Sequence, residues 1–363
     1  MPTLQPVPAS PRRSNHDGRR PIRRTRHSGQ GMTGLEVLQC GAGASVQDGG
    51  RRGSRRFGVS IAGAADRHAL AFANLLAGNA PDAAAIEFTL LGAAFRVGEG
   101  PVVLAASPNL ALKVDGIAIA PGNAARAGPG ARVTVGPIRG GVYGYLAAAG
   151  GIRTQLEMES RSVHARSGVG GRPLRSGDVV PCAPASPDLP LWRLPIPAAP
   201  KDETIRVVLG PQDDWFTAEA IETFLGSRYR VQPQSDRMGV RLAGPKLDHA
   251  RGYNIVSDGV LPGSVQVPGD GQPIALLADC QTTGGYPKIA TIISADLGRL
   301  AQVPPGGSLR FAAVSVDEAL AAARVMEAEI KALARARRQS AEAATVERLL
   351  TENLIGGVVD ATA

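Results

Sequence analysis

The sequence predicts a mainly β protein with some α-helix, and three observations support this fold class. Glycine and proline, at 45 and 28 of 363 residues, are frequent but stay below the roughly 25–30% typical of disordered chains. Short runs of Val, Ile and Leu, such as PVVLAAS and ARVTVG, recur between these turn residues. Aromatic residues make up only 4% of the chain, so aliphatic side chains must fill the core. Closely spaced short strands of this kind predict a β-barrel or a β-sandwich.

Residues 1–31 form a basic segment that we expect to be a disordered tail. Seven arginines and one aspartate give this segment +6 of the chain's net charge of +8. It lacks the apolar run of a secretory signal, and an alternative is that Met32 is the natural start. Because the remaining chain is nearly balanced in charge and has few aromatics, we expect no nucleic-acid partner.

A β-rich N-terminal subdomain is predicted for residues 32–180. One helix interrupts its strands, because Asp66 can cap a helix over residues 67–76 whose apolar residues share one face. The pair Gly78–Asn79 then ends this helix. Strand-like runs follow within 86–97 and continue at short intervals.

The second half of the chain begins after a predicted linker. Residues 181–204 contain seven prolines, and proline cannot donate a hydrogen bond to a β-ladder. A second β-rich subdomain is predicted for residues 205–315, with a helix over 217–224. Residues 316–363 become rich in Ala, Glu and Arg and predict a helical extension, as one long helix or a broken pair to about residue 350, with an apolar end.

Several classes of site have no sequence support. No lysine lies in a G-x-x-x-x-G-K-[ST] loop, and no lysine follows methionine as expected for attached biotin. No stretch approaches the roughly 20 apolar residues of a membrane span. Cys40, Cys182 and Cys280 are isolated, so we expect reduced thiols in a cytoplasmic protein, without disulfides or a metal site.

Two charged segments are candidates for binding. The segment ESRSVHARSGVGGRPLRSGD mixes serines and arginines with glycines that let backbone N–H groups approach an anion; the alternative is a solvated loop. The segment SDRMGVRL places Asp236 beside Arg237, which on a strand point to opposite faces and would by default be surface charges. The predicted anion- and nucleotide-binding residues are Ser160, Arg161, Ser162, Gly170, Gly171 and Arg172.

A polar hinge is the most unusual segment of the sequence. In LADCQTTGGYPKIATII, two apolar runs with the length of buried strands flank a glycine pair and several hydrogen-bonding side chains. The preceding stretch SDGVLPGSVQVPGDGQP adds further polar groups. These segments can be plain hairpin turns, but loops held by rigid strands are also where sites concentrate.

The same segments, together with GAADRHALAFANLLAGN and NLIGGVVDA, closely resemble the biotin-dependent carboxyltransferase family, also called the allophanate hydrolase subunit 2 family. The resemblance runs from about residue 35 to residue 361. It implies two cyclophilin-like β-barrel subdomains and a C-terminal helical extension. Free-standing bacterial members resemble the C subunit of an ATP-dependent 5-oxoprolinase, a hydrolase that opens a cyclic amide to give glutamate.

The resemblance also implies partners. A B subunit, of the allophanate hydrolase subunit 1 family, and the A subunit of 5-oxoprolinase would complete the enzyme, and this chain would be inactive alone. ATP would be the cofactor, at a site that this chain can share with a partner protein, and no biotin would be attached to this chain. We expect a small-molecule amide substrate and neither nucleic acid nor a membrane as a partner.

Amide chemistry explains why the hinge is polar. An amide is a poor electrophile, so a catalyst must fix its C=O and N–H groups and place charge where the transition state develops it. Gln281 offers both a donor and an acceptor, and Lys288 and Arg237 offer positive charge. The predicted catalytic residues are Asp236, Arg237, Gln281, Thr283, Tyr286 and Lys288. The predicted substrate-binding residues are Gln266, Asp270, Gln272, Thr282, Gly284 and Gly285.

Two other functions remain open at this point. One is a carboxyltransferase component that acts on urea or a related amide with a separate carboxybiotin carrier. The other is a non-catalytic protein that binds and regulates a partner.

Overall fold

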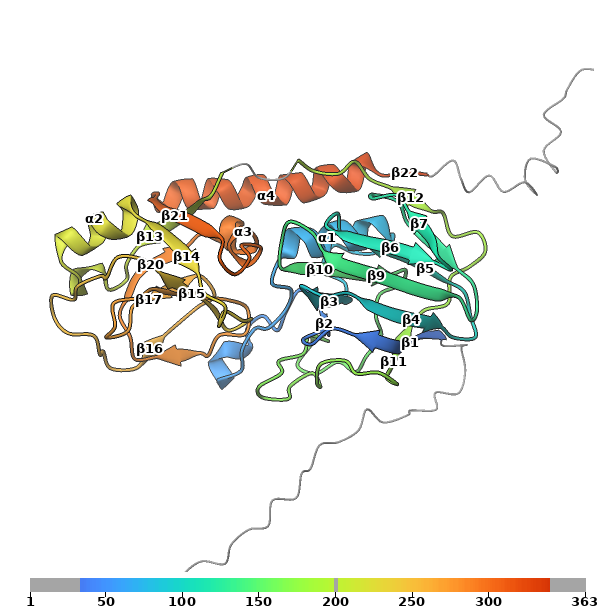
Figure 1. The fold of residues 1–363 in the computed structure, drawn as a ribbon, viewed down its shortest axis with the longest axis horizontal. Helices are drawn as coiled ribbons and strands as arrows, with labels where there is room; N and C mark the ends of the chain where they lie inside the picture. Colours follow the sequence, from blue (N-terminus) through green and yellow to red (C-terminus); the bar gives the residue numbers. More distant parts are fainter. Residues whose placement is uncertain (1–32, 199–201, 340–363) are drawn as a thin grey trace, which may run out of the picture. The chain divides into compact units, whose positions relative to one another are not determined.

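The computed structural model describes residues 33–198 and 202–339, and it confirms the predicted mainly β fold class with a C-terminal helix (Figure 1). The predicted basic tail, residues 1–31, lies outside these residues, as does the NLIGGVVDA segment. No helix in the described part of the chain is long and apolar enough to cross a membrane.

The N-terminal half contains two antiparallel sheets. The first has the order β11-β1-β4-β9-β6-β7 and the second the order β2-β3-β10-β5-β8. The strands of the first are β1 (Thr33–Cys40), β4 (Ala93–Val97), β6 (Leu110–Val114), β7 (Ile117–Ile119), β9 (Arg132–Ile138) and β11 (Val179–Cys182). Those of the second are β2 (Ser45–Gln47), β3 (Ala85–Thr89), β5 (Val102–Ala106), β8 (Ala125–Ala127) and β10 (Tyr143–Ala148).

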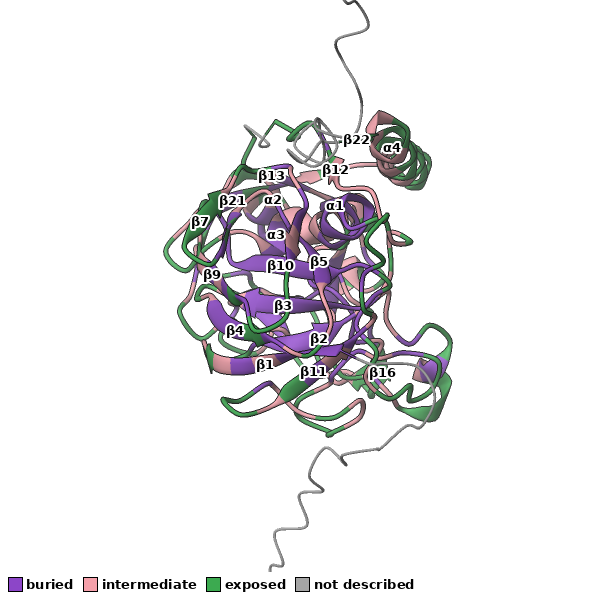
Figure 2. Cartoon of the chain, turned by 90° about the vertical axis from the view of Figure 1, so that its right-hand side faces the viewer, coloured by how far each residue is buried: buried purple, intermediate pink, exposed green. Residues whose placement is uncertain are grey.

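The core of this half is aliphatic, as the composition predicted. Ile86, Leu104 and Val133 are fully buried together with Phe88 and Phe95, whose ring centroids lie 6.3 Å apart. Figure 2 shows β2, β3, β5 and β10 almost entirely in the colour of buried residues. A buried sheet of this kind is a stiff support for the side chains at its ends.

Helix α1 (Arg67–Leu76) begins where the sequence predicted it. The Asp66 side chain accepts hydrogen bonds from the backbone N–H groups of His68 and Ala69, both at 3.0 Å. This geometry confirms the predicted N-cap. The buried residues of the helix, Leu70 and Phe72 among them, pack toward β10.

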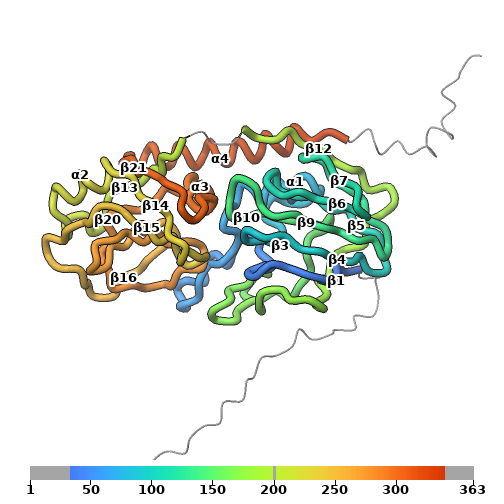
Figure 3. Tube along the Cα trace, viewed as in Figure 1, coloured from blue at the N-terminus to red at the C-terminus, as the bar shows by residue number. Residues whose placement is uncertain are grey.

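The C-terminal half contains a closed seven-stranded barrel with the order β13-β20-β17-β18-β15-β14-β21. Figure 3 follows the chain through it in yellow and orange. Its strands are β13 (Thr204–Leu209), β14 (Arg228–Val231), β15 (Gly239–Ala243), β17 (Ser264–Gln266), β18 (Ile274–Leu276), β20 (Lys288–Ile292) and β21 (Ser308–Ala313). Helix α2 (Ala218–Gly226), capped by Thr217, places Phe224 4.5 Å from the ring of Phe311.

The remaining elements are short. They are the 3₁₀ turns η1 (Ser54–Phe57), η2 (Asp213–Trp215) and η3 (Ser294–Asp296), the helix α3 (Leu297–Ala301), and the strand pairs β12 (Trp192–Arg193) with β22 (Arg338–Gln339) and β16 (Asp258–Gly259) with β19 (Thr283–Gly284). The segment 181–204, predicted as a linker, therefore holds the end of β11 and all of β12. Its boundaries as a linker stay a prediction.

Helix α4 (Val316–Ala336) starts at a capping box formed by Ser315 and Glu318. None of its residues is fully buried, and Figure 2 shows it in the colours of exposed and intermediate residues. The sequence predicted one long helix or a broken pair to about residue 350; α4 ends at Ala336, and residues 340–350 lie outside the described part of the chain. The backbone is extended at Arg337, whose guanidinium lies 4.9 Å from the ring centroid of Trp192, and β22 follows.

Replacing Asp66 tests the cap of α1. We expect Asp66→Ala to lower the free energy of unfolding by about 1 kcal/mol, because two backbone N–H groups lose their acceptor. Asp66→Asn should retain most of the stability, since asparagine caps helices equally well. Urea denaturation measures both, and equal losses in the two variants would show that the cap is unimportant.

Candidate functional site

The polar hinge of the sequence is a loop between β18 and β20 that contains the two-residue strand β19. Between β18 and β20, strand β19 pairs with β16, so that Gly284 lies opposite Asp258 and Thr283 opposite Gly259. A Cβ atom at position 284 would lie 2.5 Å from Nε2 of Gln266, so a larger residue there would displace the Gln266 side chain. The hinge is therefore fixed by pairing with a segment that precedes it along the chain.

Lys288 is the most unusual residue of this region. Its side chain is only 3% exposed, and its ammonium donates to Oδ2 of Asp258 at 2.7 Å. Gln212 supports this pair from the side of η2: its Nε2 donates to the same Asp258 oxygen at 3.1 Å, and its Oε1 accepts from the Lys288 backbone N–H. Gln266, buried beside them, donates to the Tyr286 carbonyl at 3.3 Å. We call Gln212, Asp258, Gln266 and Lys288 the Lys288 site.

The Lys288 site has hydrogen-bonding capacity that the described residues do not use. An ammonium has three N–H donors, and within residues 33–198 and 202–339 only Asp258 accepts from this one. The Asp258 side chain is 52% exposed, so the pair reaches the surface. The Lys288 ammonium and the Gly259 N–H lower the pKa of Asp258, which keeps it ionised. A buried charge with unused donors beside an exposed carboxylate can bind a C=O and an N–H group together.

The other residues predicted from the hinge do not converge on this site. The side chains of Gln281 and Thr283 are exposed, Thr282 is half-buried, and Tyr286 is 40% exposed. The carbonyl of Gly285 accepts a backbone hydrogen bond from Ile255. These residues line the surface around β19 instead of enclosing a cavity.

Arg237, predicted as catalytic, instead joins the barrel to the N-terminal sheets. Its guanidinium binds both carboxylate oxygens of Asp279 at 2.8 and 3.0 Å, the Gly63 carbonyl at 2.6 Å, and Oε1 of Glu87. Glu87 is fully buried and also accepts from the Tyr145 hydroxyl at 2.7 Å. Burial by itself lowers the pKa of Arg237, but the two carboxylates outweigh it and raise that pKa.

Three further predicted residues make hydrogen bonds to the backbone. Asp236 accepts from the backbone N–H groups of Met238 and Gly239, and Asp270 accepts from that of Gln272. The Gln272 side-chain oxygen accepts from the Gly244 N–H, and its nitrogen donates to the Gly244 carbonyl. These side chains are bonded to other parts of the chain and lie outside the Lys288 site.

The predicted anion-binding loop is occupied by the chain's own carboxylates. Asp48 accepts from the hydroxyls of Ser160 and Ser162, at 2.6 and 2.5 Å, and from the Arg161 N–H at 2.6 Å. The Gly170 N–H donates to Glu157, Arg172 forms a bidentate pair with Asp178, and Gly171 is exposed. The Ser160, Ser162, Gly170 and Arg172 donors are therefore held by internal carboxylates in this structure, and nucleotide binding by this loop stays a prediction.

Sequence reasoning missed Asp258 and Gln212. Asp258 lies in the SDG stretch that precedes the predicted block, but nothing local marks it as the partner of a lysine 30 residues later. The pairing of β16 with β19 brings it there.

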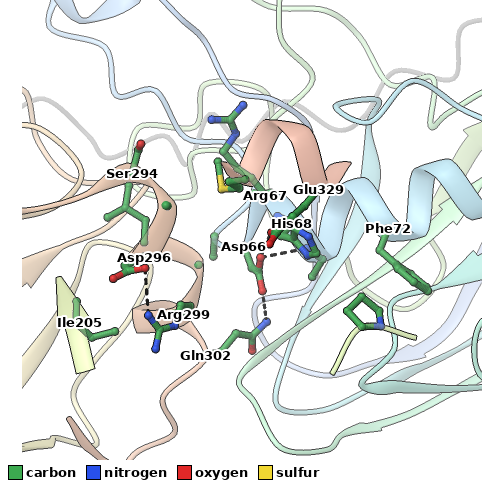
Figure 4. A pocket seen from close by; sticks show the side chains of 18 of the residues that line it. Asp66, Arg67, His68, Phe72, Ile205, Ser294, Asp296, Arg299, Gln302 and Glu329 are labelled. Carbon is green, nitrogen blue, oxygen red and sulfur yellow. Dashed lines mark hydrogen bonds and ion pairs between the residues drawn. The ribbon is translucent and has the colours of Figure 1, made fainter. Parts of the chain in front are cut away.

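A cleft of about 1570 Å³ lies apart from these residues, between α1, α4 and the segment that contains η3 and α3. Figure 4 shows Asp66 and His68 on one wall, with Gln302 donating to Asp66, and Asp296 paired with Arg299 on the other. None of the predicted catalytic residues lines this cleft. No group of three or more potential metal ligands occurs in the described part of the chain.

Known proteins resemble the chain over most of its length. Residues 57–313 match the family described as carboxyltransferase domain, subdomain A and B. The C subunit of the Escherichia coli 5-oxoprolinase is 38% identical over 301 residues, which cover 79% of this chain and 94% of that protein. The corresponding protein of Haemophilus influenzae is 35% identical, covering 78% of this chain and 93% of that one. The crystal structure of the K. lactis urea amidolyase superposes with a TM-score of 0.77 at 29% identity, over 84% of this chain but only 20% of that one.

Replacing Arg237 tests whether its ion pairs with Glu87 and Asp279 stabilise the fold. We expect Arg237→Ala to destabilise the protein by about 3–5 kcal/mol, because Glu87 and Asp279 would remain buried without a counter-charge. The exposed Arg241 provides the control, and Arg241→Ala should stay within about 0.5 kcal/mol of the wild type. Urea denaturation compares them; equal midpoints would contradict a structural role.

The lowered pKa of Asp48 should make the stability of the protein depend on pH. Burial raises the pKa of Asp48, but the bonds from Ser160, Ser162 and the backbone outweigh it and hold that pKa below 3.8. Such a group stabilises the fold above its unfolded pKa and loses this contribution as pH falls through the folded one. We therefore expect the free energy of unfolding to decrease from about pH 5 downward. Asp48→Asn should flatten this decrease and the exposed Asp188→Asn should not; identical profiles would contradict the assignment.

Proposed function

Because the chain belongs to the carboxyltransferase domain family, subdomain A and B, we propose that it is the C subunit of an ATP-dependent 5-oxoprolinase. The similarity to two 5-oxoprolinase C subunits over more than nine-tenths of their length supports this proposal. Such an enzyme hydrolyses the cyclic amide of 5-oxoproline to glutamate, and the chain would act within an assembly of several proteins.

The Lys288 site is the proposed contact with the amide. The single observation that carries this assignment is a buried ammonium with one acceptor in the described part of the chain, beside the half-exposed Asp258. Lys288 would donate to the lactam oxygen and stabilise the negative charge that develops there on ring opening. Asp258 would accept from the lactam N–H and orient the ring, while Gln212 and Gln266 hold the pair in place.

ATP enters the proposal as a substrate of the assembled enzyme. The donors predicted to bind nucleotide are taken by Asp48, Glu157 and Asp178, so we assign no ATP site to that loop. We propose that the companion proteins, the A and B subunits, bring the nucleotide to the assembly.

Reconstitution tests the function. The chain mixed with its two companion proteins should form glutamate only when both ATP and 5-oxoproline are present. Lys288→Ala should lower kcat by about 10²–10³-fold, as the loss of an oxyanion donor does elsewhere. Lys246→Ala, at an exposed lysine paired with Asp248, is the matched control and should keep full activity. Absence of turnover in a complete mixture of folded proteins would contradict the proposed function. A fully active complex with Lys288→Ala would contradict the assignment of the Lys288 site as the amide contact.

A carboxyltransferase acting on urea is the second candidate, favoured by the superposition on the urea amidolyase of K. lactis. The same mixtures, supplied with urea and a carboxybiotin carrier, decide between the two. Urea-dependent carboxyl transfer without 5-oxoproline turnover would favour this alternative.

A further inference from the structure

Ser167 and His164 form a hydrogen-bonded pair in the long loop between β10 and β11. The Oγ atom of Ser167 lies 2.6 Å from Nδ1 of His164. Ser167 is exposed and His164 is half-buried, and neither residue belongs to the Lys288 site. A serine hydroxyl beside an imidazole has a chemistry that the proposed function does not use.

The second ring nitrogen of His164 decides which nitrogen carries the proton. Nε2 lies 3.1 Å from the backbone carbonyl oxygen of Asp279, and a carbonyl oxygen can only accept a hydrogen bond. Nε2 is therefore protonated in the neutral ring, and Nδ1 presents its lone pair to the Ser167 hydroxyl. The hydroxyl proton of Ser167 thus points at a base, which is the arrangement that activates a serine nucleophile.

The carbonyl that orients the ring has a rigid support. Asp279 is only 5% exposed; its carboxylate pairs with Arg237, and its N–H donates to the Arg237 carbonyl at 2.9 Å. The backbone of His164 is also held, because its N–H donates to the Val169 carbonyl at 2.9 Å and its carbonyl accepts from the Gly168 N–H at 3.0 Å. A nucleophile, a base and a third group that orients the base are the three parts of a catalytic triad.

Other serines of the chain do not have this arrangement. Ser176, in the same loop, is also exposed, but its hydroxyl donates to the Leu38 carbonyl at 2.8 Å. A carbonyl cannot take the proton from a hydroxyl, so Ser176 is not activated. Within residues 33–198 and 202–339, His164 is the only histidine whose ring is hydrogen-bonded to a serine.

The surface next to Ser167 is open. A Cβ atom added at Gly168 or at Gly171 would meet no other part of the described chain within 4 Å. Since Ser167 itself is exposed, a small acyl group can reach its Oγ atom from solvent.

The backbone of residues 167–171 offers no oxyanion hole, and this restricts the substrate. Its five N–H groups are already donated, in order, to Nδ1 of His164, the His164 carbonyl, Oγ of Ser167, the Glu157 carboxylate and the Gly168 carbonyl. They would give little stabilisation to an oxyanion formed at Ser167. Only acyl donors with a good leaving group should therefore react, and the resulting acyl-serine should be hydrolysed slowly.

We propose that Ser167 is a nucleophile that takes the acyl group of activated carboxylic esters, with His164 as its general base. Oγ bonds to the acyl carbon while its proton moves to Nδ1 of His164. The bond from that carbon to the leaving oxygen then breaks, and the leaving group takes the proton and departs as an alcohol. Water, deprotonated by His164, later releases the acid and restores the hydroxyl. This activity is separate from the amide chemistry proposed at Lys288 and does not rest on it.

Reaction of the full chain with p-nitrophenyl acetate tests the proposal, without ATP or companion proteins. We expect a burst of about one nitrophenol per chain followed by slow turnover, because the acyl-serine accumulates. Peptide mass spectrometry should find the acetyl group on Ser167. Ser167→Ala should abolish the burst, whereas the matched control Ser176→Ala should keep it.

The variant His164→Gln distinguishes a base from a hydrogen-bonding partner. A glutamine amide still donates to the Asp279 carbonyl but is not a base, so the burst should slow by about 10²–10⁴-fold. An acetyl group found only on residues other than Ser167, a full burst in Ser167→Ala, or an unchanged rate in His164→Gln would overturn the proposal. The position of the acetyl group in the wild-type chain decides the question even if a variant does not fold.

Discussion

The contact between Arg237, Glu87 and Asp279 is the constraint on which the rest of the structure depends. It joins a turn of the barrel, a buried strand of the N-terminal sheets and the start of the polar hinge. Charges this deeply buried are tolerated only when each is paired and hydrogen-bonded. The network therefore fixes how the hinge leaves the barrel, and with it the position from which β19 pairs with β16.

Other carboxylates also join segments that are distant in the sequence. Asp48 holds the serines of the loop that follows β10, and Asp296 is fully buried between Arg206 and Arg299. Residues whose types suggest ligand binding are, in these cases, structural. Lys288 differs from them, because its one acceptor in the described residues, Asp258, is itself half-exposed. Lys288 is therefore a candidate for ligand binding because its buried charge has few partners, whereas Asp48 and Asp296 have a structural role because their carboxylates are held by several hydrogen-bonding partners.

The region that matches the carboxyltransferase domain family, residues 57–313, contains both the Arg237 network and the Lys288 site. The matching region forms a fifth of the K. lactis urea amidolyase chain, so in that protein the same fold lies within a much longer polypeptide.

The sequence by itself determined the local elements. Asp66 and Thr217 marked two helix starts, and apolar runs marked β18 and β20, because caps and strand patterns depend on neighbours within a few residues. The family resemblance also located Lys288. Only the tertiary structure decided which polar residues act together: Asp258 reaches Lys288 across 30 residues, and Glu87 reaches Arg237 across 150. Such pairs form through strand register and packing between distant segments, which local sequence does not encode, so the sequence indicates neither the ion pairs of Arg237 nor the pairing of Asp258 with Lys288.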